Sequence, residues 1–278
     1  MNALPLLVLS LAALVATDAA AAASAAKPAP AALFDKPDKI LHQLLGPGSA
    51  KTPKLGTSCF YFSHFMVKQV DTGEEGADQL SVLPIAPAKP LPCQRKNLPG
   101  ELVIPADQWS GYYKGVKGNF VLFDAADGSN GGVGFAVFAA GTGKKLFEDS
   151  AVGDLQQLTL NGGTLKLRYT RAFSGSCSVP IDGAGCWSVI AQAAGLPRDK
   201  APDCVAAYKQ GMAELAKERC KAKPHADSTC FDTELKGVED QHFDQSPSVV
   251  EYPVEADIDS AQQSVLAQPG PVSCQAAD

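Results

Sequence analysis

Hydrophobic positions are densest between Asn119 and Arg171, where they follow the two-residue period of β-strands. At the start of this stretch, Phe120 and Leu122 face one way while Val121 and Phe123 face the other. A strand that is apolar on both faces is central in its sheet or is covered on both sides. The pattern therefore predicts that the chain is organised around a sheet built from this region.

Turn residues divide the rest of this stretch into further strands. The Gly, Asn and Asp residues of 124–132 favour a turn, a second strand is expected at 134–138, and Gly141–Gly143 favours a reversal before a third strand at 145–148. A hairpin follows, in which Asn161–Gly162 is expected to form a type I′ turn. Its leucines alternate with Lys166 and Arg168, so the hairpin should bury one face and expose a basic one.

The segment before this sheet has weaker signals. A short helix is expected at 38–45 from the spacing of its leucines and isoleucine, within a linker rich in Pro and Ala. Aromatic and β-branched residues predict a single strand over 59–70, with shorter strands at 80–85 and 102–104.

Helical periodicity appears only after Arg171. Helices are expected at 187–194, from Asp203 as N-cap to about residue 221, and at 229–238. A strand follows at Val250–Ile258, and Pro253 favours an edge position for it. Because a lone strand is unstable, we expect it to pair near 164–171, with its acidic outer face opposite Lys166 and Arg168.

These elements predict an α+β fold, in which a mainly antiparallel β-sheet domain carries a small disulfide-stapled helical cap and a returning C-terminal edge strand. The expected organisation is a signal peptide at 1–25, a Pro/Ala-rich linker at 26–56, an antiparallel β domain at 57–185, a helical cap at 186–246, and a C-terminal strand and tail at 247–278 that dock on the β domain.

Eight cysteines follow the apolar N-terminal run, and an even count in that context favours four disulfides. Cys204 and Cys220 lie at opposite ends of one predicted helix, about 24 Å apart, which is too far for a bond. Cys220 with Cys230 suits a helix–turn–helix and leaves Cys204 for Cys274. The remaining expected pairs are Cys59 with Cys93 and Cys177 with Cys186.

The N-terminal pattern and the disulfides together predict a secreted or periplasmic protein with no membrane span in the mature chain. The charge is uneven, with +5 over Ala19–Pro224 and −10 over His225–Asp278. The acidic end is either an interaction arm or a segment that docks on its own basic core, and we favour docking. Net negative charge without a basic and aromatic cluster argues against nucleic acid as a partner.

No metal-ligand spacing, nucleophile elbow or phosphate-binding glycine motif is present, so we predict no catalytic residue, cofactor or metal ligand. A calcium loop at Asp124–Asn130 is a weaker alternative to a plain turn. Trp109, Tyr112 and Tyr113 could contact a ligand or line the core.

Whether the chain is an enzyme stays open at this stage. The leading hypothesis is a non-enzymatic envelope or extracellular binding module whose partner is a protein or glycan. One alternative is a hydrolase of cell-wall or glycan material that uses carboxylates, drawn from Glu74, Glu75 and Asp78 or from Glu148 and Asp149. The other is a protein inhibitor of another enzyme.

Overall fold

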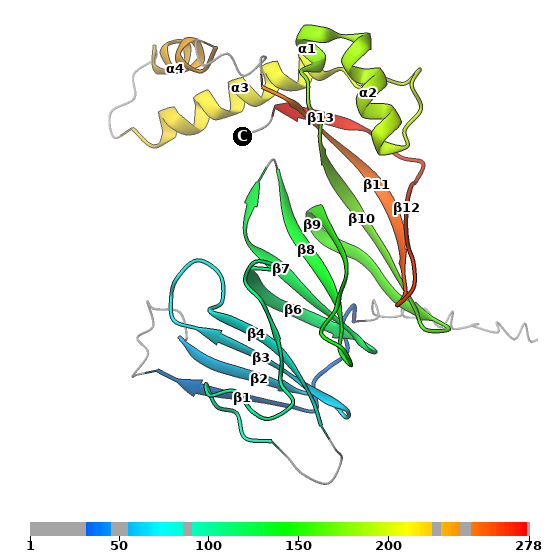
Figure 1. Cartoon of the computed structure of the whole chain (residues 1–278). Coiled ribbons are helices and arrows are strands. Elements are labelled where there is room, and N and C mark those ends of the chain that lie inside the picture. The colour runs from blue at the N-terminus through cyan, green and yellow to red at the C-terminus, as the bar shows by residue number, and fades with distance from the viewer. Residues whose placement is uncertain are drawn as a thin grey trace, which may run out of the picture. The chain divides into compact units, whose positions relative to one another are not determined.

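The computed structural model describes residues 32–45, 55–85, 91–129, 131–223, 229–239 and 246–276. The expected signal peptide and about half of the expected linker lie outside these residues, as does Asn130 of the alternative calcium loop. The fold class is confirmed, because strands dominate the chain beside a small helical region (Figure 1), the strands pair antiparallel, and disulfides bridge the helical region.

The N-terminal half forms a five-stranded antiparallel sheet whose strands follow sequence order. Its strands are β1 (Lys39–Leu44), β2 (Gly56–Tyr61), β3 (Phe65–Asp71), β4 (Gln79–Pro84) and β5 (Leu102–Ile104). Two expectations are wrong here. The helix predicted at 38–45 is strand β1, because pairing with β2 overrides a weak helical pattern. The strand predicted at 59–70 is the hairpin β2–β3, which reverses at 62–64.

The second sheet has eight strands in the order β12-β11-β10-β9-β8-β7-β6, with β13 also paired to β11. Its strands are β6 (Gly111–Lys117), β7 (Phe120–Ser129), β8 (Gly132–Ala139), β9 (Lys145–Asn161), β10 (Thr164–Ser174), β11 (Ser248–Ile258), β12 (Gln263–Ala267) and β13 (Ser273–Ala276). Most of the turn predicted at 124–132 is in fact strand, since β7 continues to Ser129 through an irregular register.

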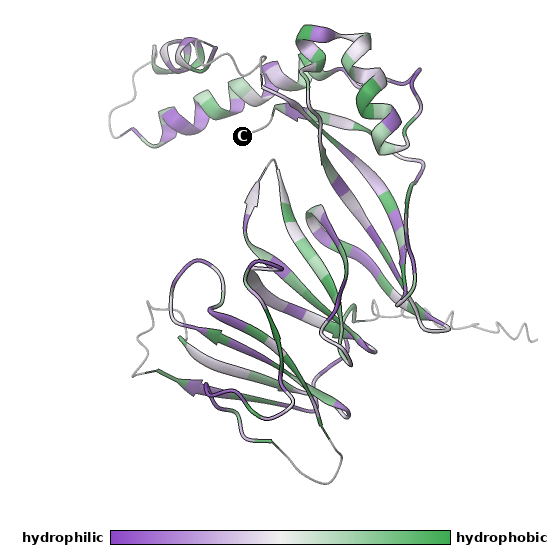
Figure 2. Ribbon diagram, viewed as in Figure 1, coloured by the Kyte–Doolittle hydropathy of each residue, from purple (hydrophilic) through white to green (hydrophobic). Residues whose placement is uncertain are grey.

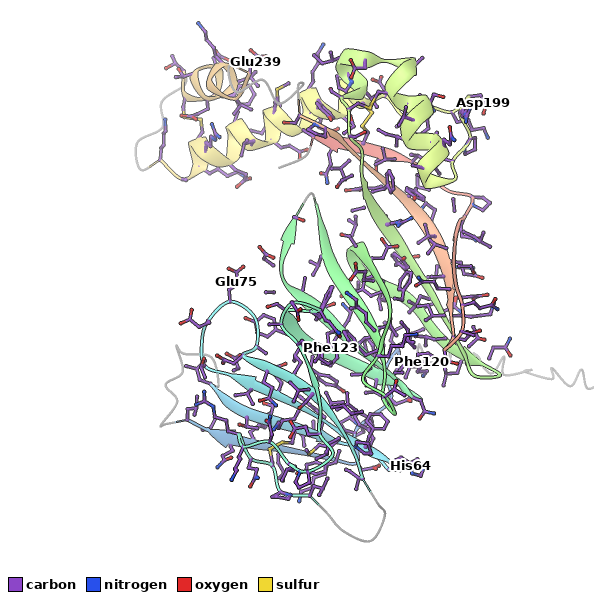
Figure 3. The ribbon with its side chains drawn as sticks, viewed as in Figure 1. His64, Glu75, Phe120, Phe123, Asp199 and Glu239 are labelled. Carbon is purple, nitrogen blue, oxygen red and sulfur yellow. A yellow bond between two sulfur atoms is a disulfide. The ribbon has the colours of Figure 1, made fainter. Side chains whose placement is uncertain are left out.

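Strand β7 is buried on both faces, as predicted. Phe120 and Leu122 belong to a core cluster with residues of β8–β11 and of helix α2 (Ala184–Ala194), whereas Val121 and Phe123 belong to a second cluster with residues of the five-stranded sheet. Figure 3 labels Phe120 and Phe123. The two faces of β7 therefore contribute to two different cores.

The β9–β10 hairpin has the predicted parity, because Leu165 pairs with Leu160 and Leu167 pairs with Leu158. The turn is displaced by one residue from the prediction. Asn161 still pairs with Thr164, so Gly162 and Gly163 form the loop, with φ of 57° and 95°. Two glycines adopt positive φ more readily than asparagine does, which explains the displacement.

The C-terminal strand β11 pairs antiparallel with β10 in the expected region. Lys166 lies opposite Asp257 and Arg168 opposite Glu255, with charged atoms 3.3 and 3.1 Å apart. Figure 2 shows hydrophilic and hydrophobic residues alternating along both strands. Residues 248–258 therefore dock on the sheet, as favoured from the charge pattern.

β11 does not lie at an edge, which corrects the expectation drawn from Pro253. β12 pairs with its residues 254–258 and β13 with its residues 248–251, so Pro253 falls in the gap between these two strands. The Pro253 carbonyl accepts from Gln268 on that side. The side of Pro253 that lacks an N–H therefore faces the gap, where strand pairing needs no hydrogen-bond donor.

The helical region contains α1 (Val179–Asp182), α2, α3 (Cys204–Lys221) and α4 (Cys230–Glu239). As predicted, the Asp203 carboxylate caps α3 by accepting from the Ala206 N–H at 3.0 Å, and Gly195 ends α2 in the left-handed conformation. The four disulfides are Cys59–Cys93, Cys177–Cys186, Cys204–Cys274 and Cys220–Cys230, visible as yellow bonds in Figure 3. No helix among the described residues is long and apolar enough to cross a membrane.

Candidate functional site

The most distinctive opening in the eight-stranded sheet lies beside the start of β9. This long strand pairs with β8 through residues 145–151 and with β10 through residues 151–152 and 157–161, with an irregular register between the two segments that pair with β10. Gly153, at a φ of 67°, lies between them. Within the described residues, 145–150 therefore have β8 on one side and no paired strand on the other.

A groove of about 480 Å³ lies at this open side, and we call it the β9–β12 groove. It is lined by residues 145–148 of β9, 263–265 of β12 and Arg171 of β10. Successive residues of a strand point to opposite faces, so a groove that touches consecutive residues runs along the strand edges. The β9–β12 groove is therefore bordered by two strand edges.

A buried polar network lies beneath the groove. Arg171 Nε donates to Asp149 Oδ1 at 2.8 Å, and the Tyr169 hydroxyl donates to Asp149 Oδ2 at 2.5 Å. Arg171 Nη1 also lies 3.4 Å from the Tyr252 hydroxyl, and the guanidinium sits over the ring of Phe173. These contacts fix the guanidinium in one orientation at the wall of the groove.

Burial and the carboxylate determine how these groups titrate. Burial, followed by the nearby Asp149 carboxylate, raises the pKa of the Tyr169 hydroxyl, so this group stays a hydrogen-bond donor. Burial opposes the charge of Arg171, but the attraction and hydrogen bonds of Asp149 and Tyr252 together outweigh burial and raise the pKa of the guanidinium. Both donors are thus permanent at any physiological pH.

The charges around the groove are paired within the protein. Lys145 Nζ lies 2.5 Å from Glu148, and Arg171 lies 2.8 Å from Asp149. The Arg171 guanidinium bonds to Asp149 and Tyr252 through Nε and Nη1, and its side chain is 24% exposed. The groove thus offers N–H donors without a net charge, which suits a neutral polar ligand better than an anion.

The predicted aromatic trio lies elsewhere, between the two sheets. The Trp109 indole donates to the Asp124 carbonyl, the Tyr112 hydroxyl accepts from the Gly76 N–H, and Tyr113 stacks on Phe60 with ring centroids 4.1 Å apart. All three side chains are partly buried in these contacts. Their contact with a ligand stays a prediction. The structure shows them packed in contacts that join the two sheets.

The carboxylates weighed for hydrolysis are not brought together. Glu74, Glu75 and Asp78 are exposed around the β3–β4 turn, where Figure 3 labels Glu75. Glu148 lines the β9–β12 groove, while Asp149 is held by Arg171 and Tyr169. A facing pair of carboxylates, as the hydrolase hypothesis requires, is not found in this groove among the residues described.

Three further openings carry less chemistry. A groove of about 570 Å³ on the outer face of the sheet involves Arg168, which is 47% exposed and already paired with Glu255. A small apolar groove of about 140 Å³ lies between α3 and α4, and one of about 240 Å³ continues the β9–β12 groove past Gln263. None of them contains a desolvated, oriented charge like that of Arg171.

Two clusters contain residue types that commonly bind metal ions. Cys177, Asp182 and Cys186 lie together, but the two sulfurs are bonded to each other and are not thiolate ligands. Asp124 of the alternative calcium loop is paired with Lys114 at 2.6 Å. Neither arrangement offers the free anionic ligands that a cation requires.

The sequence interpretation missed Arg171 as a site residue, although one signal was present. Leu165, Leu167, Tyr169 and Arg171 share one face of β10, so an arginine continues the buried series. A charged side chain on a core face needs a buried partner. Sequence spacing alone does not identify Asp149, because an irregular register near Gly153 shifts the pairing that places Ala151 of β9 opposite Arg171. Comparisons with protein-family models, with curated proteins and with solved structures found no match.

Proposed function

We propose that the chain is a secreted or periplasmic binding module whose ligand occupies the β9–β12 groove. Four disulfides support an oxidising compartment, since such bonds persist in extracellular and periplasmic proteins. The ligand is a neutral polar segment of a protein or glycan.

The observation that carries the proposal is the fixed guanidinium of Arg171. Burying the charged side chains of Arg171 and Asp149 costs free energy, and an apolar side chain at position 171 would avoid that cost. Its side chain lines a groove of about 480 Å³, which lies within the range of about 300–1,000 Å³ common for ligand sites. A binding role accounts for both features.

The test uses the full, oxidised chain on a peptide array and on a glycan array. Gln263→Arg places a long side chain on the rim of the groove, on the same face of the sheet as Arg171, and Gln156→Arg places the same group in the outer-face groove as a matched control. We expect binding to at least one array that Gln263→Arg abolishes and Gln156→Arg preserves. Equal binding by both variants, or no binding by the wild type, would reject the β9–β12 groove as the site.

A further inference from the structure

The β9–β12 groove has the surroundings of a missing strand. Its two long walls are strand edges, residues 145–148 on one side and 263–265 on the other, and neither wall is paired across the groove in the described residues. Strand edges present main-chain N–H and C=O groups that bind an extended chain. We propose that the ligand is an extended, uncharged peptide segment of a partner protein that adds to β12 as a further strand.

The direction of the β12 main chain can be derived from one bond. Gln268 N–H donates to the Pro253 carbonyl of β11, so the main-chain groups of Gln268 point toward β11. Main-chain groups alternate sides along a strand, and β12 pairs with β11 without a register shift. Leu266 and Ser264 therefore bond to β11, whereas Ala267, Val265 and Gln263 direct their N–H and C=O groups outward.

β12 also lacks the features that usually protect an edge. Residues 263–267 contain no charged side chain and no proline, and Leu266 is 63% exposed. Natural edges commonly carry lysine, proline or a bulge that discourages pairing. By contrast, the free edge of β1 begins with Lys39, and the edge strand β5 has only three residues.

The choice of a neutral peptide follows from the charges and the lining. Lys145 with Glu148 and Arg171 with Asp149 leave no net charge to attract an acidic or basic segment. Leu146, Phe147 and Val265 offer apolar contacts, and the partly exposed Arg171 guanidinium can donate to a peptide carbonyl. Added strands gain affinity from main-chain bonds and specificity from alternate side chains.

This inference rests on the proposed function, and its test separates the two. The probe is an acetylated, amidated hexapeptide of alternating threonine and valine, compared with the same peptide methylated on every main-chain nitrogen. We expect full methylation to weaken binding by about a hundredfold, because a methylated nitrogen donates no hydrogen bond. Equal binding of the two peptides would overturn strand addition.

A matched pair of variants tests the same point on the protein. Val265→Pro removes one outward N–H without removing a bond to β11, and we expect it to weaken binding of the hexapeptide by about fivefold. Leu266→Ser changes an exposed side chain on the same strand and retains every main-chain group, so binding should stay within twofold of the wild type by this account. Unaltered binding by Val265→Pro, with its fold verified by near-UV circular dichroism, contradicts the inference.

Other occupants give different results. Glycan binding that Gln263→Arg abolishes, without any hexapeptide binding, would retain the proposed function and reject strand addition. Self-association of the wild type that Val265→Pro abolishes would identify a second copy of this chain as the occupant, which also overturns the inference.

Discussion

Two buried ion pairs, one in each sheet, differ in how they are enclosed. Lys68 Nζ lies 2.6 Å from Glu101 in the five-stranded sheet, with the two side chains 0% and 1% exposed. Ser81, Gln79 and the Leu98 N–H also donate to the Glu101 carboxylate. Arg171 and Asp149 form the second pair, but Arg171 is 24% exposed and borders a groove.

The difference indicates two purposes. The Lys68–Glu101 pair is sealed, meaning that neither side chain reaches solvent, and its carboxylate accepts several hydrogen bonds. It therefore holds the segment before β5 against strand β3. The Arg171–Asp149 pair leaves a donor at an opening, which is what recognition of a ligand requires. Buried charge alone is therefore weak evidence for a binding site, and access to the charge is the deciding feature.

Breaking the sealed pair should have the largest effect. Lys68→Met leaves the Glu101 carboxylate buried without its cation, and we expect the free energy of unfolding to fall by about 3–5 kcal/mol. Urea unfolding followed by circular dichroism measures this. The double variant Lys68→Met/Glu101→Gln should recover part of the loss. A fall below about 1 kcal/mol in the single variant would show that the pair is not sealed.

Acid should remove part of the same stabilisation. Burial raises the pKa of Glu101, but the bonds from Lys68, Ser81 and Leu98 outweigh burial and lower it overall. A carboxylate whose pKa is lower in the folded state stabilises the protein above its unfolded pKa, and that contribution is lost as pH falls. The difference in unfolding free energy between wild type and Lys68→Met should narrow from about pH 6 to about pH 3. A constant difference would contradict this assignment.

Breaking the accessible pair should cost less. Asp149→Asn leaves Arg171 without its counter-charge, yet water in the groove can solvate the guanidinium, so we expect a loss of about 1–3 kcal/mol. Asp124→Asn, in the partly exposed pair with Lys114, is the control and should cost at most about 1 kcal/mol. If Asp149→Asn destabilised the fold as much as Lys68→Met does, the contrast between the two pairs would fail.

A change remote from both pairs should have the smallest effect. Gly162 has a φ of 57° and open space around the position of a Cβ, so Gly162→Ala meets only backbone strain. We expect a loss of about 1 kcal/mol, with the pairing of β10 and β11 intact. A much larger loss would mean that the β9–β10 turn is coupled to the Arg171 network.

Charge and periodicity predicted the parts of the fold that involve long, regular strands. Lys166 and Arg168 predicted the position of β11, because opposite charges and a shared buried face favour one register. The β2–β3 hairpin was missed because residues 62–64, Phe-Ser-His, carry no glycine, proline or asparagine. β1 was missed because its leucines also fit a helix, and only pairing with β2 decides between the two.

The β9–β12 groove could not be predicted from local patterns. It depends on where β9 stops pairing with β10 and on which side of β12 is left unpaired, and both are properties of the assembled sheet. Arg171 was visible as a charged residue on a core face, but its partner Asp149 lies 22 residues away on another strand. The aromatic trio was more conspicuous in the sequence, yet it joins the two sheets.

Residue-resolved amide hydrogen exchange tests the central claim most directly, on the full oxidised chain with and without the threonine–valine hexapeptide. The outward amides of Val265 and Ala267 should exchange fast in the free protein and slow markedly on binding. The amides of Ser264 and Leu266, which already bond to β11, should change little. Slower exchange at Val265 and Ala267, with little change at Ser264 and Leu266, supports strand addition to β12. Fast exchange at Val265 and Ala267 in the saturated complex would contradict it.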